Sequence, residues 1–392
     1  MKTYDDALKY LDWLCIYGIK EGLERITELA AVLGQPQNFY RTIHVAGTNG
    51  KGSVCAMLAE MLKASGLKVG LFTSPHLESY CERIRINGEN ISENDFAEMI
   101  FRVKDCNISA THFEVLTAAA FLYFKEHSVD VVVIEVGLGG FYDSTNIITP
   151  ELSIITNVAL DHENILGDLA SIARNKAGII KKNIPVVTGA KGLTLDIIRA
   201  VAKEKNSPLY EVTKPVNVKI NLRGEYQHMN AAIAIKAAQI FGIDDTAIKI
   251  GLSRVKWAGR FEIMQTTSGT VVIDGAHNPD GATALRGALD KEFPLGQRFW
   301  LFGVLKDKNF DEMIKILFRA DDFVIVTPPN SERAASTEII CSKLHERGIK
   351  CLSVENNSAA VEKLMNSGGN LKIIAGSLYL IGAVRKILID NQ

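Results

Sequence analysis

A glycine-rich stretch, AGTNGKGS, lies between an apolar segment and a segment with helical spacing. Its glycines, Gly47, Gly50 and Gly52, let backbone N–H groups face inward, and the N-terminus of a following helix adds partial positive charge. The amine of Lys51 can reach terminal phosphates, and the hydroxyl of Ser53 can bind Mg²⁺. The stretch therefore predicts a phosphate-binding loop.

The loop departs from the usual G-x-x-x-x-G-K-[ST] spacing. Val45 stands in place of the first glycine, and Gly52 separates Lys51 from Ser53. The alternative is an ordinary glycine-rich turn, but strand, glycines, lysine, hydroxyl and helix follow one another in the order that a phosphate loop requires. The residues expected to contact the nucleotide are Gly47, Thr48, Asn49, Gly50, Lys51, Gly52 and Ser53.

Two further polar residues follow strongly apolar segments. Glu135 ends the run DVVVIEV at 130–136, and His162 comes shortly after the run LSIITNV at 152–158. Such runs are typical of strands covered on both faces in a parallel sheet, whose carboxyl ends form binding sites. Burying an unpaired carboxylate costs several kcal/mol, so Glu135 should meet a cation. The alternatives are a glutamate that reaches solvent and a structural histidine.

Strand and helix patterns alternate along the 392 residues, which are too many for one core. The predicted fold class is α/β, with a doubly wound, mainly parallel sheet that carries the phosphate loop, and a smaller α/β domain after it. The predicted domains cover 1–264 and 265–392. Residues 74–88 are expected to form a loop, and 265–269 a turn.

The composition excludes several classes of protein. The net charge is −1 with both signs interspersed, so no nucleic-acid partner is expected. No apolar run approaches the ~20 residues of a membrane span. The start, MKTYDDALKYLDWL, lacks the basic and apolar regions of a signal peptide. Six cysteines without C-x-x-C spacing predict reduced, buried thiols, and together these features predict a cytoplasmic protein.

A set of motifs in a fixed order closely resembles the folylpolyglutamate and dihydrofolate synthases, a branch of the Mur ligase superfamily. The resemblance covers nearly the whole chain and implies a P-loop ATPase domain over 1–264 and a Rossmann-like domain over 265–392. It implies an ATP-dependent ligase that joins L-glutamate to a folate or dihydropteroate carboxylate through an acyl phosphate. The motifs are AGTNGKGS (46–53), TSPHL (73–77), ERIRING (82–88), EVGLGG (135–140), DSTN (143–146), LDH (160–162), NKAGII (175–180), GRFE (259–262) and DGAHNP (274–279).

The resemblance implies two magnesium sites. Ser53, Ser74, Glu135 and His162 would supply ligands, and oxygen atoms suit Mg²⁺ better than the softer histidine nitrogen does. Lys176 would take up CO₂ as a carbamate that serves the second ion. This reaction needs a neutral amine, so burial or a neighbouring cation should lower the pKa of Lys176. Without the resemblance, Lys176 would be read as an exposed helix lysine.

Other roles implied by the resemblance concern ATP and the folate. The guanidinium of Arg260 suits phosphates, and Asp274 could accept from ribose hydroxyls. The residues implied to bind ATP outside the loop are Asn230, Arg260, Asp274 and His277. The implied catalytic residues are Lys51, His162, Lys176 and Arg260. The implied folate-binding residues are Trp13, Leu14, Cys15, His112, Phe113, Glu114, Tyr142, Asp143 and Ser144.

The chain departs from the family motifs at a few positions. Phe141 stands where relatives commonly carry Arg, Ser144 replaces Ala, Asn175 replaces Glu and Cys81 replaces Asn. Phe141 and Ser144 lie beside the expected folate or diglutamate region, so these two departures bear on substrate preference. Whether the protein is a dihydrofolate synthase, a folylpolyglutamate synthase or both stays open. The remaining alternatives are another Mur-type amide ligase, a non-catalytic nucleotide-binding regulator and a P-loop kinase. A monomer is expected, with small-molecule substrates only.

Overall fold

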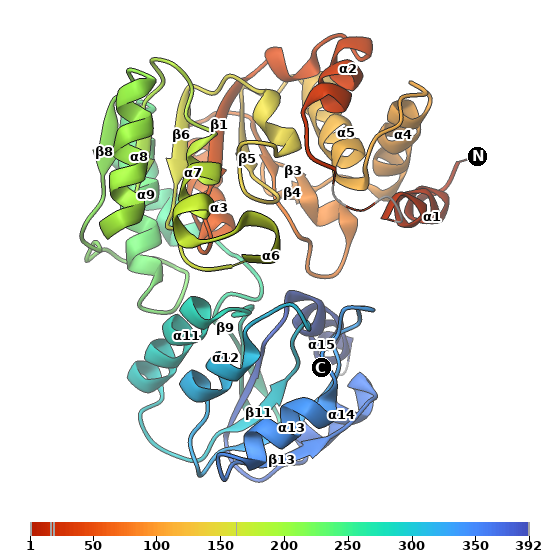
Figure 1. Ribbon diagram of the computed structural model, residues 1–392, viewed down its shortest axis with the longest axis vertical. Helices are drawn as coiled ribbons and strands as arrows, with labels where there is room; N and C mark the ends of the chain where they lie inside the picture. The colour runs from red at the N-terminus through yellow and green to blue at the C-terminus, as the bar shows by residue number, and fades with distance from the viewer. Residues whose placement is uncertain (1, 16–17, 19, 162, 391–392) are drawn as a thin grey trace. The chain divides into compact units, whose positions relative to one another are not determined.

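The computed structural model describes residues 2–15, 18, 20–161 and 163–390, and the chain divides into two units (Figure 1). The first unit takes the chain up to Asn221 and then Met229–Val255, while the second takes Leu222–His228 and everything from Lys256 onward. The chain therefore passes between the units at more than one place. The domain limit expected at 264 falls inside the strand β9 (Glu262–Thr266), which pairs with β10 (Gly269–Ile273) in the second unit.

An eight-stranded sheet forms the centre of the first unit among the described residues. Its order is β4-β3-β2-β5-β1-β6-β7-β8, and every pair from β2 to β8 is parallel. The central strands are fully buried apart from one end residue, as their apolar sequences predict. The bounds are β1 (Arg41–Ala46), β2 (Val69–Phe72), β3 (Ile84–Ile86), β4 (Glu89–Asn90), β5 (Val131–Glu135), β6 (Leu152–Ile155), β7 (Val186–Thr188) and β8 (Leu209–Glu211).

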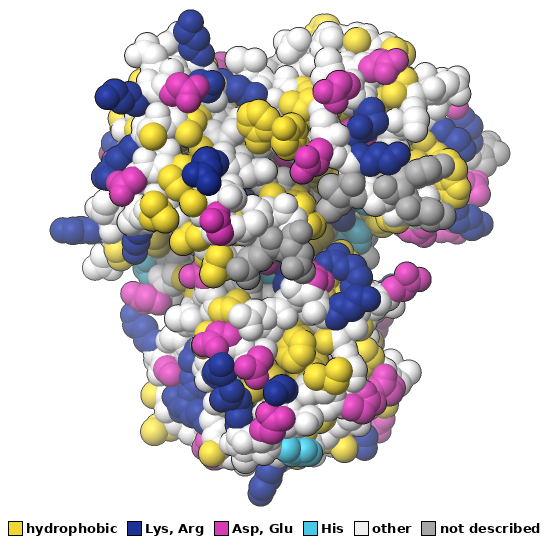
Figure 2. Space-filling view, viewed as in Figure 1, with side chains coloured by type: hydrophobic (Ala, Val, Ile, Leu, Met, Phe, Trp, Pro, Cys, Tyr) yellow, Lys and Arg dark blue, Asp and Glu magenta, His cyan; other side chains and the backbone are white. Residues whose placement is uncertain are grey.

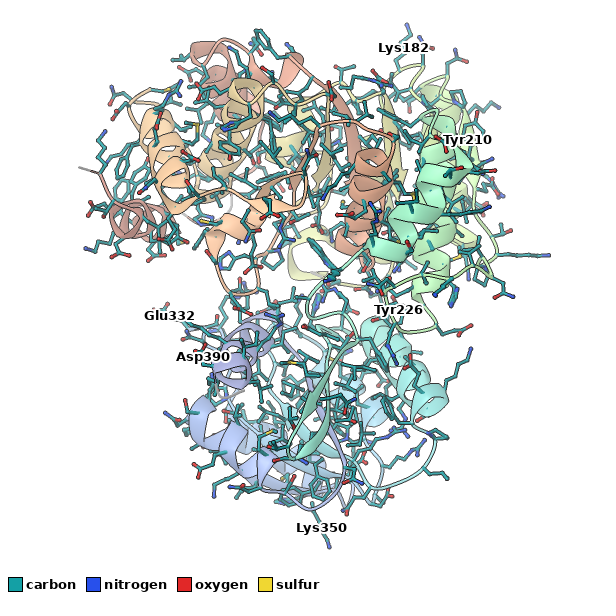
Figure 3. All side chains as sticks on the ribbon, turned by 180° about the vertical axis from the view of Figure 1, so that it is seen from behind. Lys182, Tyr210, Tyr226, Glu332, Lys350 and Asp390 are labelled. Atoms are coloured by element: carbon teal, nitrogen blue, oxygen red, sulfur yellow. The ribbon has the colours of Figure 1, made fainter. Side chains whose placement is uncertain are left out.

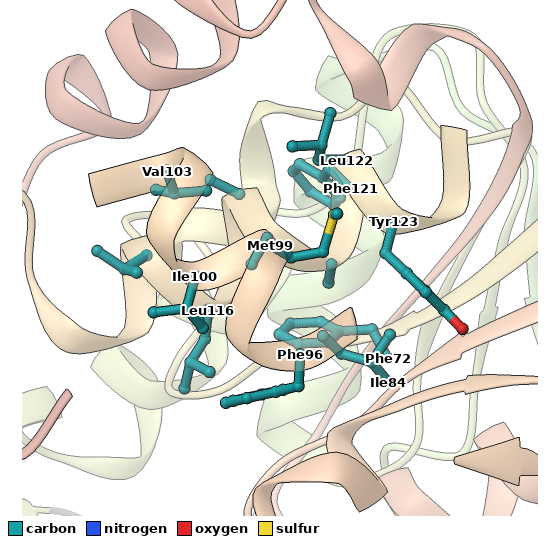
Figure 4. Packing of buried hydrophobic residues seen from close by; sticks show 14 of the residues in the cluster. Phe72, Ile84, Phe96, Met99, Ile100, Val103, Leu116, Phe121, Leu122 and Tyr123 are labelled. Carbon is teal, nitrogen blue, oxygen red and sulfur yellow. The ribbon is translucent and has the colours of Figure 1, made fainter. Parts of the chain in front are cut away.

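Helices cover this sheet and bury its apolar side chains. One large cluster joins Phe72 and Ile134 of the sheet to aromatic and aliphatic residues such as Phe96 and Phe121 (Figure 4). The helix α3 packs on β1, β2 and β5, and α10 packs on α3. The helices of this unit are α1 (Tyr4–Cys15), α2 (Glu24–Val32), α3 (Lys51–Ala64), α4 (Glu93–Lys104), α5 (His112–Glu126), α6 (Glu163–Leu166), α7 (Leu169–Ala177), α8 (Gly192–Glu204), α9 (Gln227–Ile240) and α10 (Asp245–Arg254), with 3₁₀ turns at Pro36–Asn38, Tyr80–Arg83 and Ser144–Ile147.

A six-stranded sheet forms the second unit, in the order β13-β12-β11-β14-β10-β9. Its strands are parallel except for β9. Its core gathers Trp300, Phe302 and Phe318 with aliphatic side chains of both layers. The bounds are α11 (Pro279–Glu292), β11 (Phe299–Phe302), α12 (Phe310–Leu317), β12 (Phe323–Val326), α13 (Thr337–His345), β13 (Lys350–Ser353), α14 (Asn357–Met365), β14 (Leu371–Ala375) and α15 (Leu378–Asp390).

The predicted fold class is confirmed, with two local corrections. Residues 74–88 are not loop throughout, because Ile84–Ile86 forms β3 and pairs antiparallel with β2. The expected turn at 265–269 is largely strand, because β9 continues to Thr266 and returns through a tight connection to β10.

None of the helices in the described part of the chain has the length and apolarity that a membrane crossing requires. On the face drawn in Figure 2, Lys and Arg side chains alternate with Asp and Glu rather than gathering in one patch. All six cysteines are free, as expected, but only Cys55 and Cys81 are buried, so the expectation of buried thiols is wrong for the other four.

Candidate active site

The phosphate loop joins β1 to α3, as predicted. Gly47 has φ 147° and Gly50 has φ 81°, and Gly50 is the N-cap of α3. A Cβ at Gly47 would lie 1.9 Å from Thr156 Oγ1, and one at Gly50 would lie 2.4 Å from Asn230 Oδ1. Glycine is therefore required at both positions for conformation and for space. Asn230 lies against the loop, and its contact with ATP stays a prediction.

The close approach at Gly47 gives a test of the loop. Gly47→Ala should lower the free energy of unfolding by about 1–3 kcal/mol through backbone strain alone, and the contact with Thr156 adds to this. The loop must shift to accept the methyl group, so the KM for ATP should rise. Denaturant unfolding and an ATP titration measure the two effects. Gly66→Ala is the matched control, because Gly66 also has a positive φ, 92°, but a Cβ there meets nothing within 4 Å.

The segment after β6 holds the loop from the other side. Asn49 N donates to Asn157 Oδ1 over 2.8 Å, and Thr156 Oγ1 donates to the carbonyl oxygen of Asn49 over 2.7 Å. Thr48 Oγ1 bonds both the carbonyl oxygen and the N–H of Ala159, at 3.1 and 3.0 Å. Sequence reasoning missed Thr156 and Asn157. Their signal was their position directly after an apolar strand, the same signal that singled out Glu135.

Glu135 lies at the end of β5 and is 4% exposed. Its Oε2 accepts from the backbone N–H of Ser74 over 3.1 Å, and its Oε1 is 4.0 Å from Lys51 Nζ. Lys51 Nζ also donates to the carbonyl oxygen of Thr48 over 3.2 Å. The predicted meeting of Glu135 with a cation is confirmed. Strand β5, the TSPHL loop and the phosphate loop thus converge at one edge of the sheet.

These residues fit a hard cation. A buried carboxylate, Glu135, lies beside Ser74, and the hydroxyl-bearing Ser53 is buried in the first turn of α3. Carboxylate and hydroxyl oxygens are ligands that Mg²⁺ accepts. Among the described residues, no three His, Cys, Asp or Glu side chains gather as a metal cluster. His162, the remaining expected ligand, lies outside the residues that the structure describes.

Lys176 is buried in the last turn of α7 and points at the phosphate loop. Its Nζ donates to the carbonyl oxygen of Gly47 over 2.9 Å. Burial, followed by the charge of Lys51, lowers the pKa of Lys176 to about 7, and Asp161 and Asp143 oppose this shift. The predicted lowering of this pKa, by burial and a neighbouring cation, is confirmed. A substantial fraction of the amine is therefore neutral at neutral pH, which is the form that reacts with CO₂.

The lowered pKa of Lys176 predicts a pH dependence of stability. From pH 7 up to its ordinary pKa of 10.5, the unfolded chain holds a proton on this amine that the folded chain has released. The free energy of unfolding should therefore rise with pH in this window, by up to about 1.4 kcal/mol per pH unit from this group. Lys176→Met should flatten that rise in denaturant titrations between pH 7 and 9. The exposed Lys182→Met is the control, and an equal slope in both variants would contradict the prediction.

The expected folate-binding residues take different positions in the structure. Asp143 is buried and its pKa is raised by burial, although the N–H groups of Leu138 and Thr145 and the Thr145 hydroxyl donate to it. Glu114 is occupied by an ion pair with Arg25 at 3.0 Å and by the cap of α5. Tyr142 is 47% exposed, and Ser144 Oγ lies 2.6 Å from Thr117 Oγ1.

The remaining members of this set come from α1 and α5. Trp13 is half exposed and stacks on Tyr10, with ring centroids 6.1 Å apart, while Leu14 is buried and Cys15 is exposed. His112 Nε2 lies 3.1 Å from Tyr80 Oη, and Phe113 stacks on Phe72. Burial, with the charge of Arg83, lowers the pKa of His112 to about 4, so its ring is neutral near pH 7. The contact of these residues with a folate stays a prediction.

Arg260, Asp274 and His277 gather within the second unit. Asp274 ends β10 and is buried, and its Oδ2 accepts from Phe261 N over 2.8 Å and from Tyr226 Oη over 2.9 Å. Burial raises the pKa of Asp274, and the charge of Arg260 opposes this. His277 Nδ1 donates to the carbonyl oxygen of Gly275 over 2.8 Å. Sequence reasoning missed Tyr226 as the partner of Asp274, because no local pattern links residues so far apart in the chain.

Two family patterns match the chain. The Mur ligase middle domain matches residues 45–214, and the Mur ligase, glutamate ligase domain matches residues 259–378. The first contains the phosphate loop, Glu135 and Lys176, and the second contains Arg260, Asp274 and His277. The two groups of residues described above therefore belong to two recognised domains.

Whole-chain relatives agree with these matches. The chain is 36% identical to the dihydrofolate synthase/folylpolyglutamate synthase of Bacillus subtilis, over 98% of this chain and 99% of the relative. The folylpolyglutamate synthase of Mycobacterium tuberculosis, solved with ADP, matches at a TM-score of 0.90 and 30% identity over 98% of both chains. The bifunctional folylpolyglutamate synthase/dihydrofolate synthase of Yersinia pestis, solved with AMPPNP and a manganese ion, matches at a TM-score of 0.89 and 30% identity. The match covers 99% of this chain and 98% of that chain. The chain therefore belongs to the folylpolyglutamate and dihydrofolate synthases, the ATP-dependent glutamate ligases of the Mur family.

Proposed function

We propose that this protein joins the amine of L-glutamate to the carboxylate of a folate or dihydropteroate, with ATP converted to ADP and phosphate. The observation that carries the proposal is the group at the phosphate loop. The Lys176 amine contacts Gly47, and Lys51 stands between the loop and the buried Glu135. The family consists of ATP-dependent glutamate ligases, and a solved relative from Yersinia pestis is complexed with AMPPNP and a manganese ion, which supports the proposal.

The carboxylate of the acceptor substrate is a poor electrophile until it carries a leaving group. Attack of its oxygen on the γ-phosphorus of ATP forms an acyl phosphate and releases ADP. The glutamate amine then attacks the acyl carbon, loses a proton and expels inorganic phosphate. The protein's part in such transfers is positioning and charge neutralisation. Lys51 supplies a cation beside the loop, and the N-terminus of α3 supplies backbone N–H groups.

Magnesium would neutralise phosphate charge and orient the γ-phosphate when bound. Ser53, Ser74 and Glu135 are the described residues that would hold it, together with His162. A carbamate on Lys176 would add a second anionic oxygen donor beside the loop, because the amine is buried there and its pKa is about 7. Arg260, Asp274 and His277 are proposed to meet ATP from the second domain.

A two-substrate assay tests the function. Purified protein, Mg-ATP and L-glutamate are mixed with dihydropteroate in one reaction and with a reduced folate monoglutamate in the other. Phosphate release and glutamylated product are expected in at least one reaction, and the ratio of the two rates assigns the acceptor. Product in neither reaction would overturn the proposal. Omission of L-glutamate is the control, because phosphate release without product indicates simple ATP hydrolysis.

A further inference from the structure

The GRFE motif forms a turn, and most of its polar groups form hydrogen bonds or ion pairs within the second unit. Gly259 has φ 70°, and Phe261, although it carries a side chain, has φ 47° and is 1% exposed. A bulky residue with positive φ is costly and persists only where its surroundings fix it. The contacts that fix the backbone on both sides of Arg260 therefore hold this turn in its conformation.

Two carboxylates hold the backbone of the turn. Glu262 Oε2 accepts from Gly259 N over 2.8 Å, and Asp274 Oδ2 accepts from Phe261 N over 2.8 Å. The carbonyl oxygen of Gly259 accepts from Gly275 N over 2.9 Å. The residues on both sides of Arg260 are thus fixed to the end of β10 and to the turn's own glutamate.

Each carboxylate is held in turn by a more distant residue. Arg385 of α15 binds Glu262 through two nitrogens, with Nε–Oε2 and Nη2–Oε1 distances of 2.9 Å, in a half-buried pair. The partly buried Tyr226 (Figure 3) donates its hydroxyl to Asp274 Oδ2 over 2.9 Å. Bidentate arginine–carboxylate pairs fix orientation as well as distance.

Arg260 is the exception in this turn. Among the described residues, the hydrogen bond of its side chain is a long one, 3.4 Å, from Nη1 to the carbonyl oxygen of its neighbour Gly259. A Cβ at Gly275 would lie 1.9 Å from Arg260 Nη1, so the guanidinium lies directly over that glycine. Among the described residues no carboxylate forms an ion pair with Arg260, although the charge of the nearby Asp274 acts on it, so the guanidinium remains available to an anion from outside the turn.

We propose that Glu262, Arg385 and Tyr226 are positioning residues that hold Arg260 ready for the phosphates of ATP. The inference rests on the proposed function, because it takes the anion to be the transferring phosphate. Holding a charged group in place before the reaction removes the reorganisation that the reaction would otherwise require. The ion pair and the tyrosine therefore contribute to turnover through Arg260 rather than through contact with a substrate.

A double-mutant cycle tests this assignment. Glu262→Gln and Tyr226→Phe, each nearly isosteric, are made in the wild type and in Arg260→Ala. In the wild-type background each should lower kcat roughly tenfold to a hundredfold, with little change in the KM for ATP. In the Arg260→Ala background each should change kcat by less than about twofold, because the group that they position is gone.

A structural control separates positioning from loss of stability. Asp290→Asn removes a carboxylate that Arg286, Arg298 and Arg319 share in the same unit. This variant should lower the melting temperature and leave kcat unchanged. Effects of Glu262→Gln and Tyr226→Phe that persist in Arg260→Ala would overturn the proposal, as would an Arg260→Ala variant with full kcat. A wild type inactive with both acceptors would overturn the proposed function itself, and the inference with it.

Discussion

Replacing Lys176 with alanine is expected to lower turnover by on the order of a hundredfold to a thousandfold, the loss typical when one charged contact to the reacting phosphate is removed. Lys176 is 5% exposed and its amine donates to the carbonyl oxygen of Gly47, so the change falls on the phosphate loop itself. With the pKa of Lys176 at about 7, much of the amine is neutral at neutral pH, the form that a reaction with CO₂ would require. Initial rates with saturating Mg-ATP and acceptor measure the loss.

Chemical rescue distinguishes a carbamate from a simple lysine. If the required group is a carboxylate, then formate or acetate should restore part of the activity of Lys176→Ala, whereas small amines should not. Removing dissolved CO₂ should slow the wild type and leave the variant unchanged. Lys182→Ala is the matched control (Figure 3), because Lys182 is exposed and lies a few residues further along the chain. Full activity in Lys176→Ala would show that Lys176 has no role in turnover. Rescue by amines alone would show that the required group is a protonated lysine rather than a carbamate.

The sequence predicted the architecture of the chain where apolar periodicity was strong. Residues 130–136 and 152–158 contain the central strands β5 and β6, one on each side of β1, because uninterrupted apolar runs are stable in the middle of a covered sheet. The helices α4 and α5 begin after Ser92 and Thr111, whose side chains cap them and belong to residue types that favour helix N-termini.

The elements that were missed have weaker local signals. The helix α10 has Gly251 in its middle, which lowers helix propensity, and its reason is a close approach to α3: a Cβ there would lie 2.5 Å from Met61 N. The short strands β3 and β9 lie at or near the edges of their sheets and pair antiparallel. Their sequences alone do not specify a partner, so tertiary pairing decides them.

The candidate site was predictable only in part, for a similar reason. Residues that end apolar strands, such as Glu135 and Asp274, are visible in the sequence because a carboxylate at the end of a buried strand is unusual. Their partners are not: Ser74 binds Glu135 through a backbone N–H, and Tyr226 reaches Asp274 from another part of the chain. Backbone donors and long-range contacts leave no trace in local residue types. The sequence therefore indicated which side chains carry the chemistry, whereas the groups that orient those side chains became known only from the structure.

Replacing Glu135 with glutamine should weaken magnesium-dependent catalysis while the fold is kept. Glutamine has nearly the same shape, and its carbonyl oxygen can still accept from Ser74 N, which now lies 3.1 Å from Glu135 Oε2. The change removes the negative charge that a hard cation requires and leaves Lys51, 4.0 Å away, without its anion. The magnesium concentration for half-maximal rate should rise by on the order of tenfold or more, since second-shell changes alone typically cost that much in metal affinity.

A magnesium titration of initial rates, with ATP held in excess, measures this shift. Glu151→Gln is the matched control, because Glu151 precedes β6 at the opposite end of the strands and pairs there with Arg41 at 2.7 Å. That variant should titrate like the wild type. If the role of Glu135 is instead to hold Lys51, the magnesium midpoint of Glu135→Gln should equal that of the wild type. In a Lys51→Met background, Glu135→Gln should then cause no further change in rate. An unchanged midpoint in Glu135→Gln would therefore show that Glu135 does not bind the metal and that its buried carboxylate acts only through Lys51.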